Sequence, residues 1–146
     1  MKRVFILCAG LLVAGAAMAN VPPKVNASIN ARLLKEFNNA SNVSWVRTGD
    51  YTEAIFDWNG KKSQAFFTQE GNLVAFAQNV SIENLPQKTL STIQTKYSKY
   101  KITELSRIEH AEVGTKYYIA LENETKRIIL ETDINGSISV FQKSNK

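Results

Sequence analysis

Hydrophobic positions in the first half of the chain recur at helical spacing and then at strand spacing. Ser28 is the expected N-cap of a helix whose apolar face comprises Ile29, Leu33, Leu34 and Phe37. Four runs of alternating apolar and polar residues follow, at 42–47, 51–58, 61–68 and 73–79. The pairs Gly49-Asp50, Asn59-Gly60 and Glu70-Gly71 separate these runs, which predicts a helix followed by a four-stranded antiparallel meander.

The second half repeats this order. Pro86 is favoured at the first position of a helix, and Leu90, Ile93 and Tyr97 would face inward from it. Strand-like runs then cover 101–110, 116–122, 126–132 and 137–141, with Asn135-Gly136 at the last turn. The sequence predicts an α+β fold of two tandem repeats, each a helix plus a four-stranded antiparallel meander, with the helices packed on one sheet face. Whether the repeats share one sheet stays open.

The domain organisation follows from these repeats. We expect an extended N-terminal lead at 20–28, then one domain at 29–141 that contains repeat one at 29–79 and repeat two at 86–141. A C-terminal tail would cover 142–146. About 60 residues per repeat is within the usual range of small structural units.

The turn at Asn59-Gly60 fixes which residues share a face of the sheet. A two-residue turn places Phe56 opposite Ser63 and Ala54 opposite Ala65, on the more apolar face that should meet the helices. Asp57 then lies opposite Lys62 as a cross-strand ion pair on the other face. That other face is mostly polar with a few large apolar groups: it carries Tyr51, Glu53, Ile55, Asp57, Lys62, Gln64, Phe66 and Thr68.

The second hairpin divides in the same way around a turn at Asn123-Glu124. Tyr117, Ile119, Leu121, Ile128 and Leu130 would meet the helix. Tyr118, Ala120, Glu122, Arg127, Ile129 and Glu131 would lie on the other face, where Lys116 meets Glu131. Because Tyr and Arg often dominate interface energies, Tyr51, Phe66, Tyr118 and Arg127 are our candidate partner-binding residues. The alternative is a half-solvated sheet with scattered aromatic side chains.

The N-terminus has the three parts of a secretory signal peptide. Lys2 and Arg3 precede an apolar run at 4–16, and Ala17-Met18-Ala19 supplies small residues for cleavage. The apolar run is shorter than the ~20 residues that a membrane span needs. We therefore expect residues 1–19 to be removed, no membrane anchor to remain, and the mature protein to be periplasmic or secreted.

Cleavage also changes the chemistry that is available. The mature chain would contain neither the one Cys nor the two Met, so it could form no disulfide and no Cys metal site. Its net charge would fall from +5 to +3 because Lys2 and Arg3 are lost. No run of basic residues exceeds two, so nucleic acid is not an expected partner.

Catalytic motifs are not recognisable in the mature chain. The single His, His110, neighbours Glu109, but adjacent residues of a strand point to opposite faces. The Asp residues at positions 50, 57 and 133 lie at expected turns or on the hairpin face. We therefore expect no catalytic residue, no cofactor and no metal site, and we do not expect an enzyme.

Several apolar and turn positions together resemble a known family. They are Trp45, Tyr51, Ala54, Phe56, Asn59-Gly60, Phe67, Gly71, Leu85-Pro86, Ile93, Tyr97 and Gly136. This succession resembles the β-lactamase-inhibitor-like, PepSY-like family of predicted periplasmic proteins, over residues 29–141. The resemblance implies a small exported protein whose open sheet face contacts a partner protein. No partner-contact motif of the β-lactamase inhibitor is recognisable.

Two functions are consistent with this pattern and resemblance. The first is an exported non-catalytic binding protein, a protein-binding or inhibitor-like module that uses the open sheet face against an exported or envelope protein. The second is a binder of small ligands or cell-envelope material in a cleft between the repeats. A contiguous patch of Tyr, Phe and Ile on the open face would favour the first, and a deep pocket lined by Trp45 or Trp58 the second. The sequence leaves the oligomeric state open.

Overall fold

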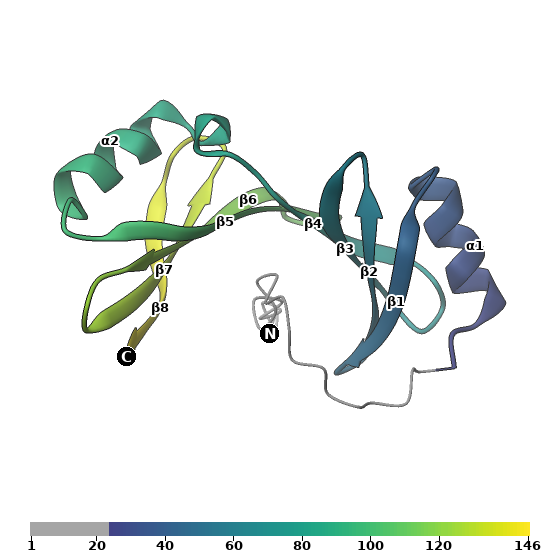
Figure 1. Cartoon of the computed structure of the whole chain (residues 1–146). Coiled ribbons are helices and arrows are strands. Elements are labelled where there is room, and N and C mark those ends of the chain that lie inside the picture. Colours follow the sequence, from purple (N-terminus) through teal and green to yellow (C-terminus); the bar gives the residue numbers. More distant parts are fainter. Residues whose placement is uncertain (1–23) are drawn as a thin grey trace.

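A computed structural model describes residues 24–146; the expected signal peptide and the first residues of the lead lie outside this range. The described residues form an α+β fold with one eight-stranded antiparallel sheet, in which the strands lie in chain order (Figure 1). The elements are α1 (Ala27–Glu36), β1 (Ser41–Thr48), β2 (Tyr51–Trp58), β3 (Lys61–Phe67), β4 (Leu73–Asn79), the 3₁₀ helix η2 (Ile82–Asn84), α2 (Gln87–Lys96), β5 (Lys101–His110), β6 (Gly114–Glu122), β7 (Lys126–Asp133) and β8 (Ile138–Asn145).

Helix α1 begins earlier than its sequence pattern predicted. The N-cap is Asn26, whose side chain accepts a hydrogen bond from the backbone N–H of Ser28, so the prediction of Ser28 as N-cap was wrong. Ile29 and Leu33 are buried, as predicted. Leu34 is 48% exposed, because it lies about 100° around the helix from Leu33 and points away from the sheet.

Helix α2 also differs at its start. Pro86 occupies the N-cap rather than the first helical position, with an extended backbone. Ile93 is buried and Leu90 and Tyr97 pack against the same cluster, which confirms the predicted inward face. Strand β8 continues to Asn145, so most of the expected C-terminal tail belongs to the sheet.

The first hairpin has the register that its turn predicted. Phe56 pairs with Ser63, and Asp57 pairs with Lys62. Asn59 and Gly60 both have positive φ, at 51° and 75°, as a type I′ turn requires.

The second hairpin is offset by two residues from its predicted register. Lys116 pairs with Asp133 and Tyr118 pairs with Glu131, because the turn comes one residue later than predicted. The cause is Asn123, whose side-chain oxygen accepts hydrogen bonds from the backbone N–H groups of Thr125 and Lys126. Since side chains alternate with a period of two, this offset leaves every residue on its predicted face.

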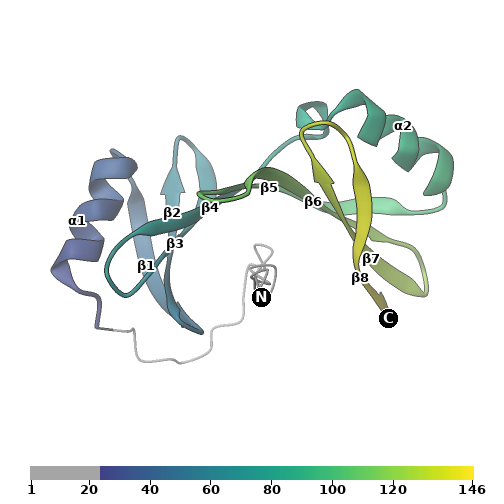
Figure 2. The same cartoon turned by 180° about the vertical axis from the view of Figure 1, so that it is seen from behind.

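Both helices pack on one face of an arched sheet, which we call the convex face (Figures 1 and 2). Each helix covers its own apolar cluster. The α1 cluster contains Ile29, Leu33, Phe37, Ala54, Phe56, Ala65 and Phe67. The α2 cluster contains Leu85, Ile93, Leu105, Tyr117, Ile119, Leu121, Ile128 and Leu130.

The two halves of the sheet are joined where β4 pairs with β5, through residues 75–79 and 106–110. This pairing makes one continuous sheet and settles the question that the sequence left open. It also places residues from both halves side by side on the opposite face, which we call the concave face.

Candidate interaction surface on the concave face

An apolar cluster lies on the concave face, and no helix of the described residues contributes to it. Its buried members come from five consecutive strands, β3 to β7, and therefore from both halves of the chain. They are Phe66, Ala75, Ala77, Ile108, Tyr118 and Ile129, with Val74 and Phe141 packed against them. We call this set the concave cluster.

Two of the four predicted binding residues belong to the concave cluster. Phe66 is 3% exposed and Tyr118 is 5% exposed, and the ring of Phe141 meets that of Tyr118 edge-on at 5.4 Å between centroids. The sequence predicted a mostly polar face with large apolar groups open to solvent. The structure corrects this prediction: the large groups gather into a buried floor, since the curvature of the sheet brings neighbouring strands' side chains together.

The other two predicted residues lie around this floor. Tyr51, at the start of β2, is half-buried. Burial raises the pKa of its phenol, and the nearby carboxylates of Asp50 and Glu112 raise the pKa further. Because Glu112 follows the end of β5, Tyr51 marks a point where the two halves of the chain approach each other.

Hydrogen-bonded polar groups surround the floor on the side of the first half. Gln64 donates a hydrogen bond to Glu53 at 2.8 Å, and both side chains are buried. Asp57 accepts hydrogen bonds from Lys62 at 2.9 Å and from Asn42 at 2.7 Å. These two donors, Lys62 first, lower the pKa of the Asp57 carboxyl, so this group stays ionised at neutral pH.

A second polar group lies beside Tyr118. The Tyr118 hydroxyl donates to Glu131 at 2.8 Å, and Lys116 forms an ion pair with the same carboxylate. His110, at the end of β5, is half-buried. Burial lowers the pKa of the imidazole, and the positive charge of Lys116 lowers it further, whereas the carboxylate of Glu131 raises it. The net effect is a lowered pKa, so His110 is neutral at pH 7.

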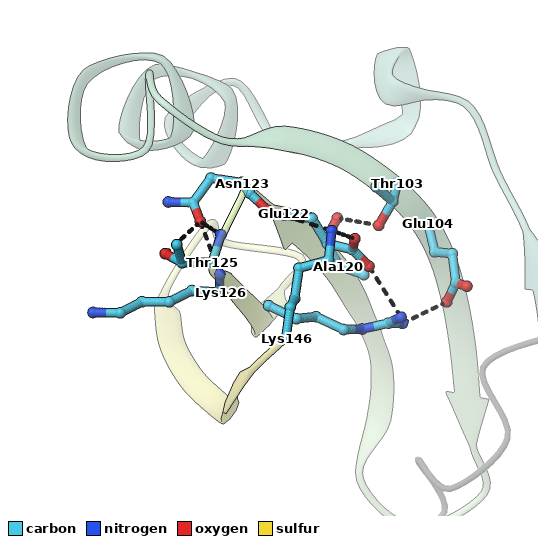
Figure 3. Close-up of polar contacts among 9 residues, drawn as sticks. Thr103, Glu104, Ala120, Glu122, Asn123, Thr125, Lys126 and Lys146 are labelled. Atoms are coloured by element: carbon cyan, nitrogen blue, oxygen red, sulfur yellow. Dashed lines mark hydrogen bonds and ion pairs between the residues drawn. The ribbon is translucent and has the colours of Figure 1, made fainter.

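Arg127 is held by two carboxylates at the far end of the concave face. It forms ion pairs with Glu104 on β5 and Glu122 on β6, each at 3.1 Å (Figure 3). Lys146 binds Glu122 at 2.8 Å, and this hydrogen bond is the main cause of the lowered pKa of Glu122. The guanidinium is therefore fixed in position and its charge is largely compensated.

Ser106 is a feature of this face that the sequence reasoning missed. It is 3% exposed, and its hydroxyl has no hydrogen-bond partner among the described residues. It pairs with Tyr118 in the β5–β6 ladder, so it lies next to the concave cluster. The sequence did contain a signal for it. Ser106 lies two positions before Ile108 in the same strand, so alternation places the two side chains on the same face.

The other residues that the sequence singled out, Glu109, His110, Trp45 and Trp58, are not members of the concave cluster. Residues 24–146 contain no group of three His, Asp or Glu side chains that could hold a metal ion. Glu109 pairs with Arg107 rather than with His110, as the strand alternation predicted. Trp45 and Trp58 pack against the α1 cluster, and the Trp58 indole N–H donates to the Asn38 carbonyl at 3.0 Å. In the part of the chain described here, no helix has the length and hydropathy of a membrane span.

Together these features define a class of protein: an α+β domain in which, within residues 24–146, two α-helices cover one face of an eight-stranded antiparallel meander and neither lies on the other face. No family model and no curated protein matches this sequence. Solved structures of the same class do match.

The similar structures come from Bacteroides species. A BLIP-like protein from Bacteroides fragilis has a TM-score of 0.69 at 22% identity, over 86% of this chain and 88% of that one. A predicted periplasmic protein from Bacteroides eggerthii has a TM-score of 0.74 at 16% identity, over 83% and 88%. A DUF2874 family protein from Bacteroides uniformis has a TM-score of 0.73 at 16% identity, over 83% and 89%. The chain thus has the BLIP-like fold, which confirms the fold that the resemblance predicted.

Proposed function

We propose that this protein is an exported, non-catalytic binding protein whose concave face contacts a partner protein of the cell envelope or the secreted fraction. The observation that carries the proposal is the concave cluster, which is contiguous across five strands and has no helix over it within the described residues. The similarity to a BLIP-like protein and to a predicted periplasmic protein supports both the binding role and the export.

The four candidate residues have different parts in this proposal. Phe66 and Tyr118 form the floor, because they are buried and fix the shape of the surface. Tyr51 and Arg127 lie around the floor and are half-buried, so they would make the first contacts with the partner. Interfaces of this kind combine an apolar centre with a polar rim of satisfied charges.

We also infer that the two helix-plus-meander units are repeats of one unit. Each unit has a ten-residue helix followed by four strands. In both units a glycine with positive φ, in the turn between the last two strands, lies against the first turn of the helix. Gly71 lies beside Ser28 and Ile29, and Gly136 lies beside Lys88.

The binding proposal is tested by capture from an envelope extract with the mature protein as bait. The Tyr51→Ala/Tyr118→Ala variant should lose the captured partner. The control variant, Leu34→Ala/Ile134→Ala, removes two exposed apolar side chains that lie outside the concave cluster, and it should retain the partner. Thermal unfolding of each variant verifies that it is folded.

Because Tyr118 is buried, a third variant separates folding from recognition. Tyr118→Phe keeps the ring in the floor and removes only the hydroxyl that donates to Glu131. In the background of Tyr51→Ala it should weaken capture while the protein stays folded. Equal capture by the wild type and by both folded Tyr51 variants would show that the chosen face is wrong.

A further inference from the structure

Strand β8 is an edge strand, and its pairing is one-sided. It pairs with β7 along its length, and among residues 24–146 no segment pairs with its outer side. An edge strand of this kind presents unpaired backbone N–H and C=O groups, which can accept a further strand.

The C-terminal part of β8 is the regular part of this edge. The register shifts near Val140, but residues 142–145 pair in regular succession with residues 126–129. No proline interrupts β8. By contrast, the other edge strand, β1, is irregular between Ser41 and Ser44, where Asn42 has a φ of 52°. Bulges and twists protect edges from pairing, so 142–145 is the more receptive edge.

A hollow of about 210 Å³ lies at this end of β7 and β8, lined by Lys126, Arg127, Ile128, Lys143, Ser144 and Asn145. Lys126 and Lys143 are exposed, and neither forms an ion pair with another described residue. The nearby carboxylates of Glu104 and Glu122 are already engaged by Arg127 and Lys146. The hollow therefore has an excess of positive charge.

We propose that the outer edge of β8 binds an extended acidic segment of a partner protein as a ninth strand, with a carboxylate of that segment at Lys126 and Lys143. Backbone hydrogen bonds to residues 142–145 supply the alignment, and the two lysines select for negative charge. The edge adjoins the concave cluster, because Phe141 belongs to both and Arg127 lines the hollow. The proposal rests on the unpaired edge and on Lys126 and Lys143, which the concave-face function does not use.

The test uses three synthetic peptides of about ten residues, the length of a strand and its ends. The first alternates Val and Thr and carries Glu at both ends; the second has Lys in place of Glu; the third is the Glu peptide with a central Pro. Each is titrated into the isotope-labelled mature protein while backbone amide shifts are recorded. We expect the Glu peptide alone to bind and to shift the amides of residues 142–145.

Two charge-reversal variants then separate the hollow from general electrostatics. Lys126→Glu/Lys143→Glu should weaken binding of the Glu peptide about tenfold or more. Lys96→Glu/Lys99→Glu makes the same charge change at two exposed positions at the end of α2, and it should weaken binding much less. Absence of binding, shifts only at residues away from β7 and β8, equal losses in both variants, or tolerance of the central Pro would each overturn the proposal.

A second copy of this chain is the competing occupant. If the β8 amides of the free protein shift with protein concentration, the edge pairs with another copy, and the acidic-segment proposal is wrong.

Discussion

On the convex face each helix covers its own apolar cluster, whereas on the concave face one cluster crosses from β3 to β7 and no helix of the described residues contributes to it. The helix-covered clusters are local: each belongs to one half of the chain. The concave cluster contains residues of both halves and lies over the β4–β5 junction. The difference indicates that the convex side stabilises each half, and that the concave side joins the two halves.

The largest expected difference between the faces concerns two phenylalanines. Phe56 is fully buried beneath α1, with its ring centroid 5.1 Å from that of Phe37. Phe56→Ala should lower the free energy of unfolding by about 3–5 kcal/mol, since it leaves an enclosed cavity. Phe66→Ala, on the concave face, should cost about 2 kcal/mol, because neither α1 nor α2 encloses the vacated space. Urea denaturation measures both, and a larger cost for Phe66→Ala would reverse the comparison.

The next largest effect on the free energy of unfolding is expected where the β7–β8 turn packs against α2. Gly136 has a φ of +80°, and a Cβ there would lie 2.8 Å from the Cβ of Lys88. Gly136→Ala should therefore lower the free energy of unfolding by about 1–3 kcal/mol. Gly114→Ala is the matched control, with a φ of +79° and no atom within 4 Å, and should cost about 1 kcal/mol. Equal costs for the two in thermal unfolding would contradict the close packing of the turn on α2.

A buried hydroxyl pair tests how α2 is held on the sheet. Thr89 on α2 and Thr132 on β7 are fully buried and hydrogen-bonded at 2.9 Å. Thr132→Val leaves the Thr89 hydroxyl without this partner and should cost about 1–3 kcal/mol. The double variant Thr89→Val/Thr132→Val should recover most of that loss, because neither hydroxyl is then buried alone. Additive costs in the double-mutant cycle would show that the pair is not coupled.

Two buried serines on opposite faces sharpen the comparison further. Ser63, on the convex face, accepts a hydrogen bond from Gln78 at 3.0 Å and donates to the Lys61 carbonyl. Ser63→Ala should cost about 1 kcal/mol. Ser106 has no partner among the described residues, so Ser106→Ala should be neutral or slightly stabilising. A loss of stability in Ser106→Ala as large as that in Ser63→Ala would mean that its hydroxyl is satisfied in solution.

The smallest effect is a pH dependence that arises on the concave face. The pKa of His110 is lowered in the folded state, so the unfolded chain binds a proton more readily. His110 therefore contributes its full stability above about pH 6.5, and part of it is lost as the pH falls below that value. His110→Gln should make the melting temperature less sensitive to pH between about 7.5 and 5. An identical pH dependence in the variant and the wild type would contradict the burial of this imidazole.

The first hairpin could be predicted from its sequence because Asn59-Gly60 fixes the turn type, and the turn fixes the register. The register of the second hairpin differs from its prediction because the Asn123 side chain accepts hydrogen bonds from the backbone N–H groups of Thr125 and Lys126. Such local side-chain hydrogen bonds compete with strand pairing, and residue spacing alone does not reveal them. The exposure of Leu34 was missed because two adjacent leucines cannot both face the sheet, and the pattern does not say which one does.

The concave cluster could be predicted only in part. Alternation placed Phe66 and Tyr118 on the right face, but their membership of one cluster depends on the pairing of β4 with β5, which joins the two halves of the chain. Ser106 becomes a neighbour of Tyr118 through the β5–β6 ladder, and Glu104 on β5 reaches Arg127 on β7. Local periodicity therefore predicts which face of the sheet each side chain occupies. The arrangement of the concave cluster depends on strand pairing between distant parts of the chain, which local periodicity does not predict.

Hydroxyl-radical footprinting of the mature protein, with and without a captured envelope partner, tests the role of the concave face most directly. We predict that the partner lowers the labelling of Tyr51 and leaves Leu34 and Ile134, which lie outside the concave cluster, unchanged. Protection of Leu34 and Ile134 with unchanged labelling of Tyr51 would place recognition elsewhere and contradict the account.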